Sequence, residues 1–207
     1  MMNHVLICLF LLFSDNLFAQ IGQADNGDGT YTNPILSSAK DNLRLFSYQL
    51  PENFKNYWDV PNLLLQKFPA EEFMATTKLV YNPCLDGEKI GFTVFGLDYA
   101  YLSLTKKGNS SELAFTTCKD ADKGTAEKET IITKLTEKST VFFRVLVKKD
   151  GLCQFSYSSD GATFMDVGEP FKARVGKWIG AKLGFFCTRN VKTNDSGFAD
   201  IDYLTSK

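Results

Sequence analysis

The sequence predicts an all-β protein, built as an antiparallel sandwich of two sheets. Three observations support this fold class. Short runs rich in Val, Ile, Phe, Tyr and Thr recur from residue 43 onward, which is typical of strands. Asp-Gly pairs lie between several of these runs, at 86–87, 150–151 and 160–161, and suit tight hairpins because both residues tolerate positive φ. No stretch shows sustained helical periodicity.

The expected strands follow one another at short intervals. Tyr99 and Tyr101 alternate with Ala100 and Leu102, so the two pairs face opposite sides of a sheet. We expect the aliphatic pair to face the core and the tyrosines to lie on a polar surface. Residues 119–130 are charged and are expected to form a loop. The predicted strands span residues 43–47, 63–68, 73–81, 89–96, 99–106, 112–118, 129–135, 141–148, 153–158, 178–187 and 198–206.

Residues 1–19 form an apolar leader that ends in Ala19. The leader is too short to span a bilayer and resembles a secretory signal peptide cleaved before Gln20. We therefore expect export to the periplasm or the medium, with no membrane attachment after cleavage. His4, in the leader, is the only histidine of the chain. The mature protein thus lacks the residue that Ser-His triads and histidine metal sites require.

The cysteines do not fix a disulfide pattern. Cys8 leaves with the leader, and Cys84, Cys118, Cys153 and Cys187 remain. Four cysteines allow three pairings, and their spacing lacks the paired cysteines of a zinc site. Each lies in or beside an apolar run, so buried free thiols are an equal alternative to disulfides.

The charge balance excludes two classes of partner. The chain carries 23 Lys and Arg against 24 Asp and Glu, and the two signs are interspersed. Because there is no basic stripe, we expect neither nucleic acid nor an anionic membrane as a partner.

The stretch from Gln23 to Leu36 resembles half of a calcium loop. Asn26, Asp28 and Gly29 fit the third, fifth and sixth positions of such a loop. The first and twelfth positions, which should supply ligands, are apolar residues. The segment is therefore interpreted as a turn, and no metal site and no cofactor are predicted.

Six runs, in order along the chain, carry a family resemblance. Together they are similar to the carboxy-terminal β-sandwich of glycoside hydrolase family 43, in its β-xylosidase and α-L-arabinofuranosidase branch. The resemblance implies a jelly-roll sandwich of the concanavalin-A or laminin-G type, in agreement with the strand pattern. The runs are LPENFKNYWDVPNLLLQKFPAEEF (50–73), GLDYAYLSLTKKG (96–108), TTCKDADKG (116–124), FSYSSDGATFMDVGEPF (155–171), GKWIGAKLGFFC (176–187) and TNDSGFADIDY (193–203).

A seventh run, ADNGDGTYTNPIL (24–36), resembles the start of the same family's catalytic five-bladed propeller. In the family, NPIL leads into a motif whose Asp is the general base; here it leads into SSAKDN (37–42). Asp41 lies at a similar distance but lacks the context of that motif, and the general-acid segment has no counterpart. The expected layout is a signal peptide at 1–19, an extended stub at 20–42 and the β-sandwich accessory domain at 43–207, with the propeller missing.

The carboxyl groups do not suggest glycoside hydrolysis by this chain. Glu71 and Glu72 are adjacent and would point to opposite faces of a strand. Asp200 and Asp202 share a face, where hydrogen bonding is the favoured interpretation over catalysis or calcium binding. We therefore predict no catalytic residues and no enzyme activity for this chain.

Aromatic residues are the candidates for carbohydrate binding or for contact with another domain. Tyr57, Trp58, Tyr99 and Tyr101 are the main candidates, since sugar sites place flat rings against the apolar face of a pyranose. Packing in the core or between domains is the competing interpretation for each of them. Trp178 opens an apolar run and is assigned to the core. Phe68 and Phe73, with Tyr57 and Trp58, are expected to form an apolar patch where a propeller would pack.

Three functions follow in order of preference. The first is a non-catalytic accessory module of a hemicellulose-degrading family 43 protein, with a catalytic propeller as its partner. The second is a free-standing module that binds xylan or arabinan oligosaccharides. The third is a truncation product with no role beyond its fold.

Overall fold

The computed structural model describes residues 24–25, 31–32, 36–39, 42–60, 62–176 and 180–206. These residues form two seven-stranded sheets and a small two-stranded ladder. The ladder joins Ala24–Asp25 (β1) to Tyr31–Thr32 (β2). The predicted all-β, two-sheet sandwich is confirmed.

The first sheet runs in the order β11-β10-β9-β8-β15-β5, and β6 also pairs with β15. All of its ladders are antiparallel except the short parallel pairing of β15 with β5. Its strands are Tyr48–Gln49 (β5), Leu64–Lys67 (β6), Lys89–Phe95 (β8), Tyr99–Lys107 (β9), Ser110–Cys118 (β10), Lys128–Thr136 (β11) and Lys182–Arg189 (β15).

The second sheet is antiparallel throughout and runs in the order β14-β13-β12-β7-β16-β4-β3. Its strands are Leu36–Ala39 (β3), Asn42–Phe46 (β4), Phe73–Asn82 (β7), Ser139–Lys148 (β12), Leu152–Ser158 (β13), Met165–Lys172 (β14) and Phe198–Ser206 (β16). Three short 3-10 helices lie in the connections, at Tyr57–Asp59, Ala121–Lys123 and Lys149–Gly151.

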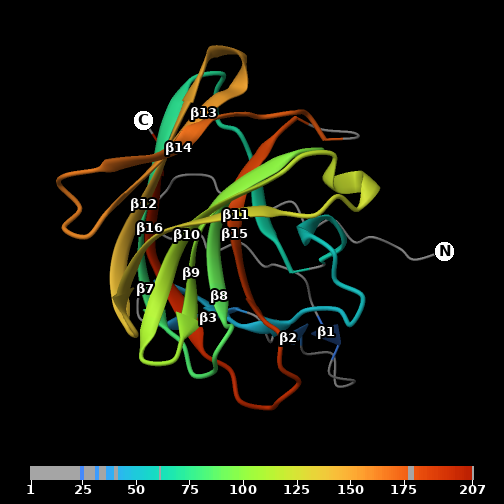
Figure 1. Ribbon diagram of the computed structural model, residues 1–207, viewed down its shortest axis with the longest axis vertical. Coiled ribbons are helices and arrows are strands. Elements are labelled where there is room, and N and C mark those ends of the chain that lie inside the picture. Colours follow the sequence, from blue (N-terminus) through green and yellow to red (C-terminus); the bar gives the residue numbers. More distant parts are fainter. Residues whose placement is uncertain are drawn as a thin grey trace.

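The two sheets enclose the main hydrophobic core. Figure 1 shows β8, β9 and β10 in one layer and β7, β12 and β16 in the other. On β12, Val141, Phe143, Val145 and Val147 are buried and alternate with residues on the outer face. They pack with inner residues of the first sheet such as Leu102. The period-two pattern therefore directs one side of each strand into the core, as expected for a sandwich.

The predicted strands are observed at closely similar positions, and five further strands were not predicted. They are the short strands β1, β2, β3 and β5, and the longer β14. β14 contains Gly168 and Pro170, which weaken a strand assignment. It lies at the edge of the second sheet, where proline, which has no backbone N–H, is tolerated because one side of the strand has no partner. The strand predicted at 178–187 is observed at Lys182–Arg189 (β15).

The four cysteines of the described residues are unpaired. Cys118, Cys153 and Cys187 are buried, whereas Cys84 is exposed. Burial is the main cause that raises the pKa of all three buried thiols, that of Cys153 to about 12. These thiols therefore behave as small core residues.

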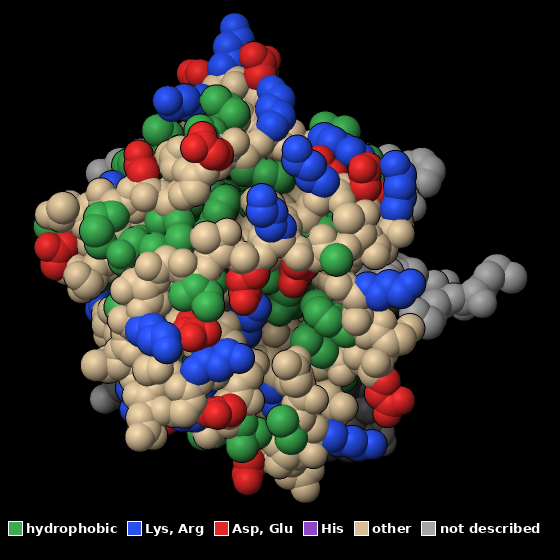
Figure 2. Space-filling model, viewed as in Figure 1, with side chains coloured by type: hydrophobic (Ala, Val, Ile, Leu, Met, Phe, Trp, Pro, Cys, Tyr) green, Lys and Arg blue, Asp and Glu red, His purple; other side chains and the backbone are tan. Residues whose placement is uncertain are grey.

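The surface carries charges of both signs. Figure 2 shows Lys and Arg interspersed with Asp and Glu over the visible face, with hydrophobic side chains in small groups between them. None of the short helices in the described residues has the length or the apolar character to cross a membrane.

Candidate functional site

The two sheets differ in what covers their outer faces. Over the first sheet, Phe54, Tyr57, Trp58 and Val60 pack on the outer side chains of the strands and form a second apolar cluster with them. Among the described residues, no comparable segment covers β12 and β13 of the second sheet, where Leu146 and Leu152 remain 38% and 37% exposed. The outer face of the first sheet therefore lies under an aromatic cluster, called the closed cluster below, and the outer face of the second sheet is open at β12 and β13.

Tyr57 lies at the centre of the closed cluster. Its ring centroid lies 4.0 Å from that of Phe186 and 5.6 Å from that of Tyr101. Its hydroxyl is 2.9 Å from Thr188 Oγ1, and its backbone N–H donates to Tyr99 Oη at 2.9 Å. Asn56 caps the short helix at Tyr57–Asp59 by accepting from Trp58 N–H and donates to the carbonyl oxygens of Ala121 and Thr125. These bonds fix the covering segment on the sheet.

Glu127 supplies the polar partner of the tyrosine pair. Its Oε1 accepts from the hydroxyls of Tyr99 at 2.7 Å and Tyr101 at 3.1 Å. Burial raises the pKa of Glu127, and burial also raises the pKa of Tyr57, Tyr99 and Tyr101. The hydroxyls accordingly remain neutral donors, and the network satisfies the polar ends of an otherwise apolar cluster.

The predicted binding residues are therefore mostly inside the molecule. Tyr57 is 2% exposed, and Tyr99 and Tyr101 are 0% exposed. Their rings pack against one another and offer no free face on the surface, which agrees with the packing interpretation made for them. Trp58 is half-buried and stacks on Phe95 with centroids 5.9 Å apart. The tyrosines face away from Ala100 and Leu102, as expected, but toward a second core and not toward a polar surface.

The remaining aromatic predictions have separate outcomes. Phe73 is buried and contacts Phe68, with ring centroids 5.0 Å apart, and both belong to the main core. They therefore form no common patch with Tyr57 and Trp58, which belong to the closed cluster. The expected patch is wrong because packing between the sheets and under the covering segment takes up these rings. Trp178 lies outside the described residues.

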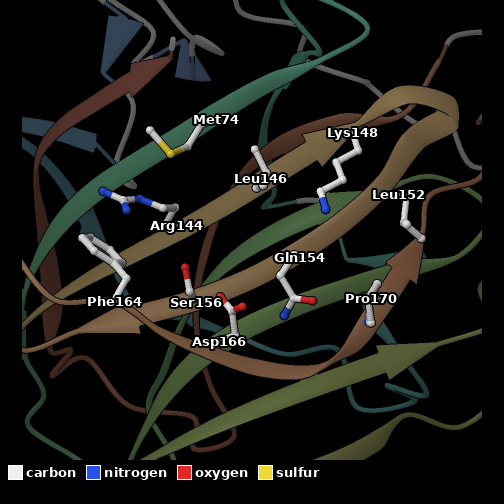
Figure 3. Close-up of a pocket in the computed structure, with 10 residues that line it drawn as sticks. All are labelled: Met74, Arg144, Leu146, Lys148, Leu152, Gln154, Ser156, Phe164, Asp166 and Pro170. Atoms are coloured by element: carbon white, nitrogen blue, oxygen red, sulfur yellow. The ribbon is translucent and has the colours of Figure 1, made fainter.

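An open hollow of about 400 Å³ lies on the outer face of the second sheet. Figure 3 shows its side chains rising from β7, β12, β13 and β14 and from the turn before β14. The volume falls within the range of small-molecule sites, about 300–1,000 Å³. The lining residues are Met74, Arg144, Leu146, Lys148, Leu152, Gln154, Ser156, Phe164, Asp166 and Pro170.

Strand register arranges the lining in rows. Thr76, Arg144, Ser156 and Asp166 are cross-strand neighbours on β7, β12, β13 and β14. The next row contains Met74, Leu146 and Gln154, and a third joins Lys148 to Leu152. Cross-strand neighbours on one face lie within reach of each other. The hollow thus has a polar row, which contains Arg144, beside a row with the apolar residues Met74 and Leu146, and Lys148 lies at the end of β12.

Arg144 is held in place within this hollow. Its Nε donates to Thr76 Oγ1 at 2.9 Å, and its guanidinium carbon lies 3.4 Å from the ring centroid of Phe164. Figure 3 shows the guanidinium between Met74 and Phe164. Phe164 follows the turn in which Asp160 Oδ1 accepts from Ala162 N–H and Thr163 N–H at 2.8 and 2.9 Å. A structured turn therefore positions the ring on which Arg144 stacks.

The two carboxyl groups that the sequence places on one face of the last strand are each engaged by a cation. Asp200 accepts two bonds from Arg44 at 2.7 and 2.8 Å, and Asp202 pairs with Lys78 at 2.6 Å, as favoured for these residues. Asp166 is the single carboxyl group among the described lining of the hollow. The described residues also contain no group of three metal-ligating side chains. Asp41 lies outside the described residues.

Residues 31–207 match the family of β-xylosidase C-terminal concanavalin A-like domains, GH43_C2. Because the match covers most of the chain, the protein belongs to this family. A comparison with curated proteins gave no match.

Solved structures with the same fold include several GH43 proteins. A bifunctional GH43-CE protein from Bacteroides eggerthii is 18% identical, with a TM-score of 0.68, over 84% of this chain and 22% of its own. The xylan β-1,4-xylosidase from Bacillus halodurans is 16% identical, with a TM-score of 0.62, over 94% of this chain and 41% of its own. The chain thus spans only about a fifth to two fifths of the length of these two proteins.

Sequence reasoning missed the hollow entirely. Its lining comes from four strands and a turn between residues 74 and 170, and no local motif links them. The available signal was Leu146. On this strand, the valines and Phe143 face the core, and Leu146 is an apolar residue on the outer face, between Arg144 and Lys148. Such a position marks an outer face that is not uniformly polar.

Proposed function

We propose that this chain is a non-catalytic accessory module of a hemicellulose-degrading GH43 protein of the β-xylosidase and α-L-arabinofuranosidase type. The observation that carries the proposal is the family match, which covers residues 31–207 and corresponds to the C-terminal sandwich alone. The GH43 structures with the same fold, of which this chain covers only 22% and 41%, support a GH43 catalytic domain as the partner.

The carboxyl groups support a module without hydrolytic activity. Hydrolysis of a glycosidic bond uses two carboxyl groups about 5–9.5 Å apart across the scissile bond. The hollow has only Asp166 among its described residues, and Asp200 and Asp202 are engaged by Arg44 and Lys78. The leader-like segment at 1–19 supports a role outside the cytoplasm, secreted or periplasmic.

A free-standing module that binds xylan or arabinan is the second candidate. The open hollow favours it, since it combines apolar and hydrogen-bonding side chains on one face. A truncation product without a role of its own has no comparable support.

A thermal melt of the purified protein with neutral arabinoxylan oligosaccharides separates the first two functions. A ligand that binds only the folded state raises the melting temperature. For an accessory module, we expect one cooperative transition whose midpoint neutral oligosaccharides leave unchanged. A midpoint that rises with neutral oligosaccharide concentration and saturates would instead establish the free-standing binding module.

A further inference from the structure

Arg144 differs from the other arginines in the described part of the chain. Arg44 pairs with Asp200, Arg174 with Asp98 and Asp120, and Arg189 donates to backbone carbonyl groups. Arg144 bonds only through Nε, to Thr76, and no described carboxyl group lies within 4.0 Å of its guanidinium. Its two terminal nitrogens therefore remain available at the hollow.

This guanidinium is also oriented before any ligand arrives. The bond to Thr76 and the stacking on Phe164 hold its plane. A held guanidinium matches the two oxygens of a carboxylate with parallel N–H···O bonds. Because little side-chain freedom is left to lose, such a site binds a planar anion more tightly than a mobile surface arginine would.

The rest of the hollow suits a ligand with more than an anionic group. Met74 and Leu146 supply apolar surface, and Ser156 and Asp166 lie in the same row as Arg144. Gln154 donates its amide N–H groups to the carbonyl oxygens of Phe155 and Val167, which leaves its Oε1 as an acceptor. Apolar C–H faces next to hydroxyl groups are the chemistry of a saccharide.

We propose that this hollow binds an acidic saccharide, with the carboxylate of a uronate unit on the terminal N–H groups of Arg144. Asp166 favours this ligand over an acidic peptide, since a carboxyl group accepts bonds from sugar hydroxyls but repels a run of carboxylates. Lys148, four residues along β12 and thus about 13 Å from Arg144, extends the site beyond one sugar unit. Only the choice of a hemicellulose as the source of the uronate rests on the proposed function; the anion site itself is argued from Arg144 and its neighbours.

Calorimetric titration of the purified protein tests the proposal with three probes. They are a xylotetraose with one glucuronate branch, unbranched xylotetraose, and a glutamate-rich peptide. We expect the branched saccharide to bind about tenfold or more tightly than the unbranched one, a difference of about 1.4 kcal/mol or more. Arg144→Gln should abolish this difference. Arg144→Lys should lose most of it, because lysine cannot form the two parallel bonds.

Lys119→Gln is the matched control, because it also removes one positive charge from an exposed position but lies outside the hollow. Its affinities should equal those of the unmodified protein, and melting curves should show that all variants remain folded. Equal binding of the two saccharides, no binding of either, an unchanged Arg144→Gln variant, or Arg144-dependent binding of the peptide alone would each overturn the proposal. Failure of the saccharide proposal would not decide the accessory role. That role is tested separately, by the thermal melt with neutral oligosaccharides and by an assay of hydrolysis.

Discussion

Replacement of Tyr57 by alanine is expected to lower the free energy of unfolding by about 3–5 kcal/mol, the range for loss of a buried aromatic ring. The ring is 2% exposed and contacts Phe54, Tyr101 and Phe186. Its removal would open a cavity under the covering segment and withdraw the partner of Thr188 Oγ1. Urea unfolding, followed by intrinsic fluorescence, measures the change. This loss is a large fraction of the stability of a typical domain.

Tyr57→Phe is the control for the packing explanation. It keeps the ring and removes only the hydrogen bond to Thr188, so the expected loss is about 1 kcal/mol. If Tyr57→Ala unfolds at nearly the same urea concentration as the unmodified protein, the ring is not a structural element of the closed cluster. The interpretation of Tyr57 as an exposed binding residue would then have to be reconsidered.

Replacement of Glu88 by alanine is expected to cost at least about 3 kcal/mol, because it leaves several buried donors without an acceptor. Glu88 is 0% exposed. Its Oε1 accepts from Gly197 N–H at 2.6 Å and from the Ser47 hydroxyl, and its Oε2 accepts from Cys84 and Leu85 N–H at 2.6 and 3.0 Å. This carboxyl group thus joins three separate segments of the chain. Thermal and urea unfolding should both report the loss.

Glu88→Gln separates the hydrogen bonds from the volume of the side chain. One amide oxygen still accepts two bonds, while the NH₂ group faces two donors, so we expect an intermediate loss. Glu52→Gln, at an exposed position in the 51–55 turn region, should have no measurable effect. Equal stabilities of the Glu88→Ala and Glu52→Gln variants would contradict the role assigned to Glu88. The backbone of Gly197 lies close to the Glu88 carboxyl group, which explains why position 197 is a glycine. A Cβ there would lie 2.3 Å from Glu88 Oε2.

Most of the fold could be predicted because its strands obey local rules. The runs at 73–81, 99–106 and 141–148 alternate, or carry many β-branched and aromatic residues, and the structure places strands there. β14 could not be predicted from such rules, since it combines Gly168, Pro170 and exposed polar residues. It is a strand because β13 offers it a hydrogen-bonding edge, and that is a tertiary circumstance.

Less of the candidate site than of the fold could be predicted from the sequence. The alternation of Tyr99 and Tyr101 with aliphatic residues gave their orientation correctly, but nothing local shows that Tyr57 and Phe54 fold back over them. Strand periodicity distinguishes two faces and does not say what covers the second. The hollow depends on the register of four strands, and Arg144 is recognisable only once the partners of the other arginines are known.

The most direct test of a non-catalytic module is an assay of sugar release by the purified protein alone. Arabinoxylan and aryl xylosides and arabinosides would be incubated with the protein, and released xylose and arabinose would be quantified by chromatography. We predict no release above that of a buffer control at any pH from 4 to 9, because the family match is to a C-terminal sandwich domain and Asp166 is the single carboxyl group among the described lining of the hollow. Release that scales with protein concentration and is lost in an Asp166→Asn variant would contradict this account and place a catalytic carboxyl group in the hollow.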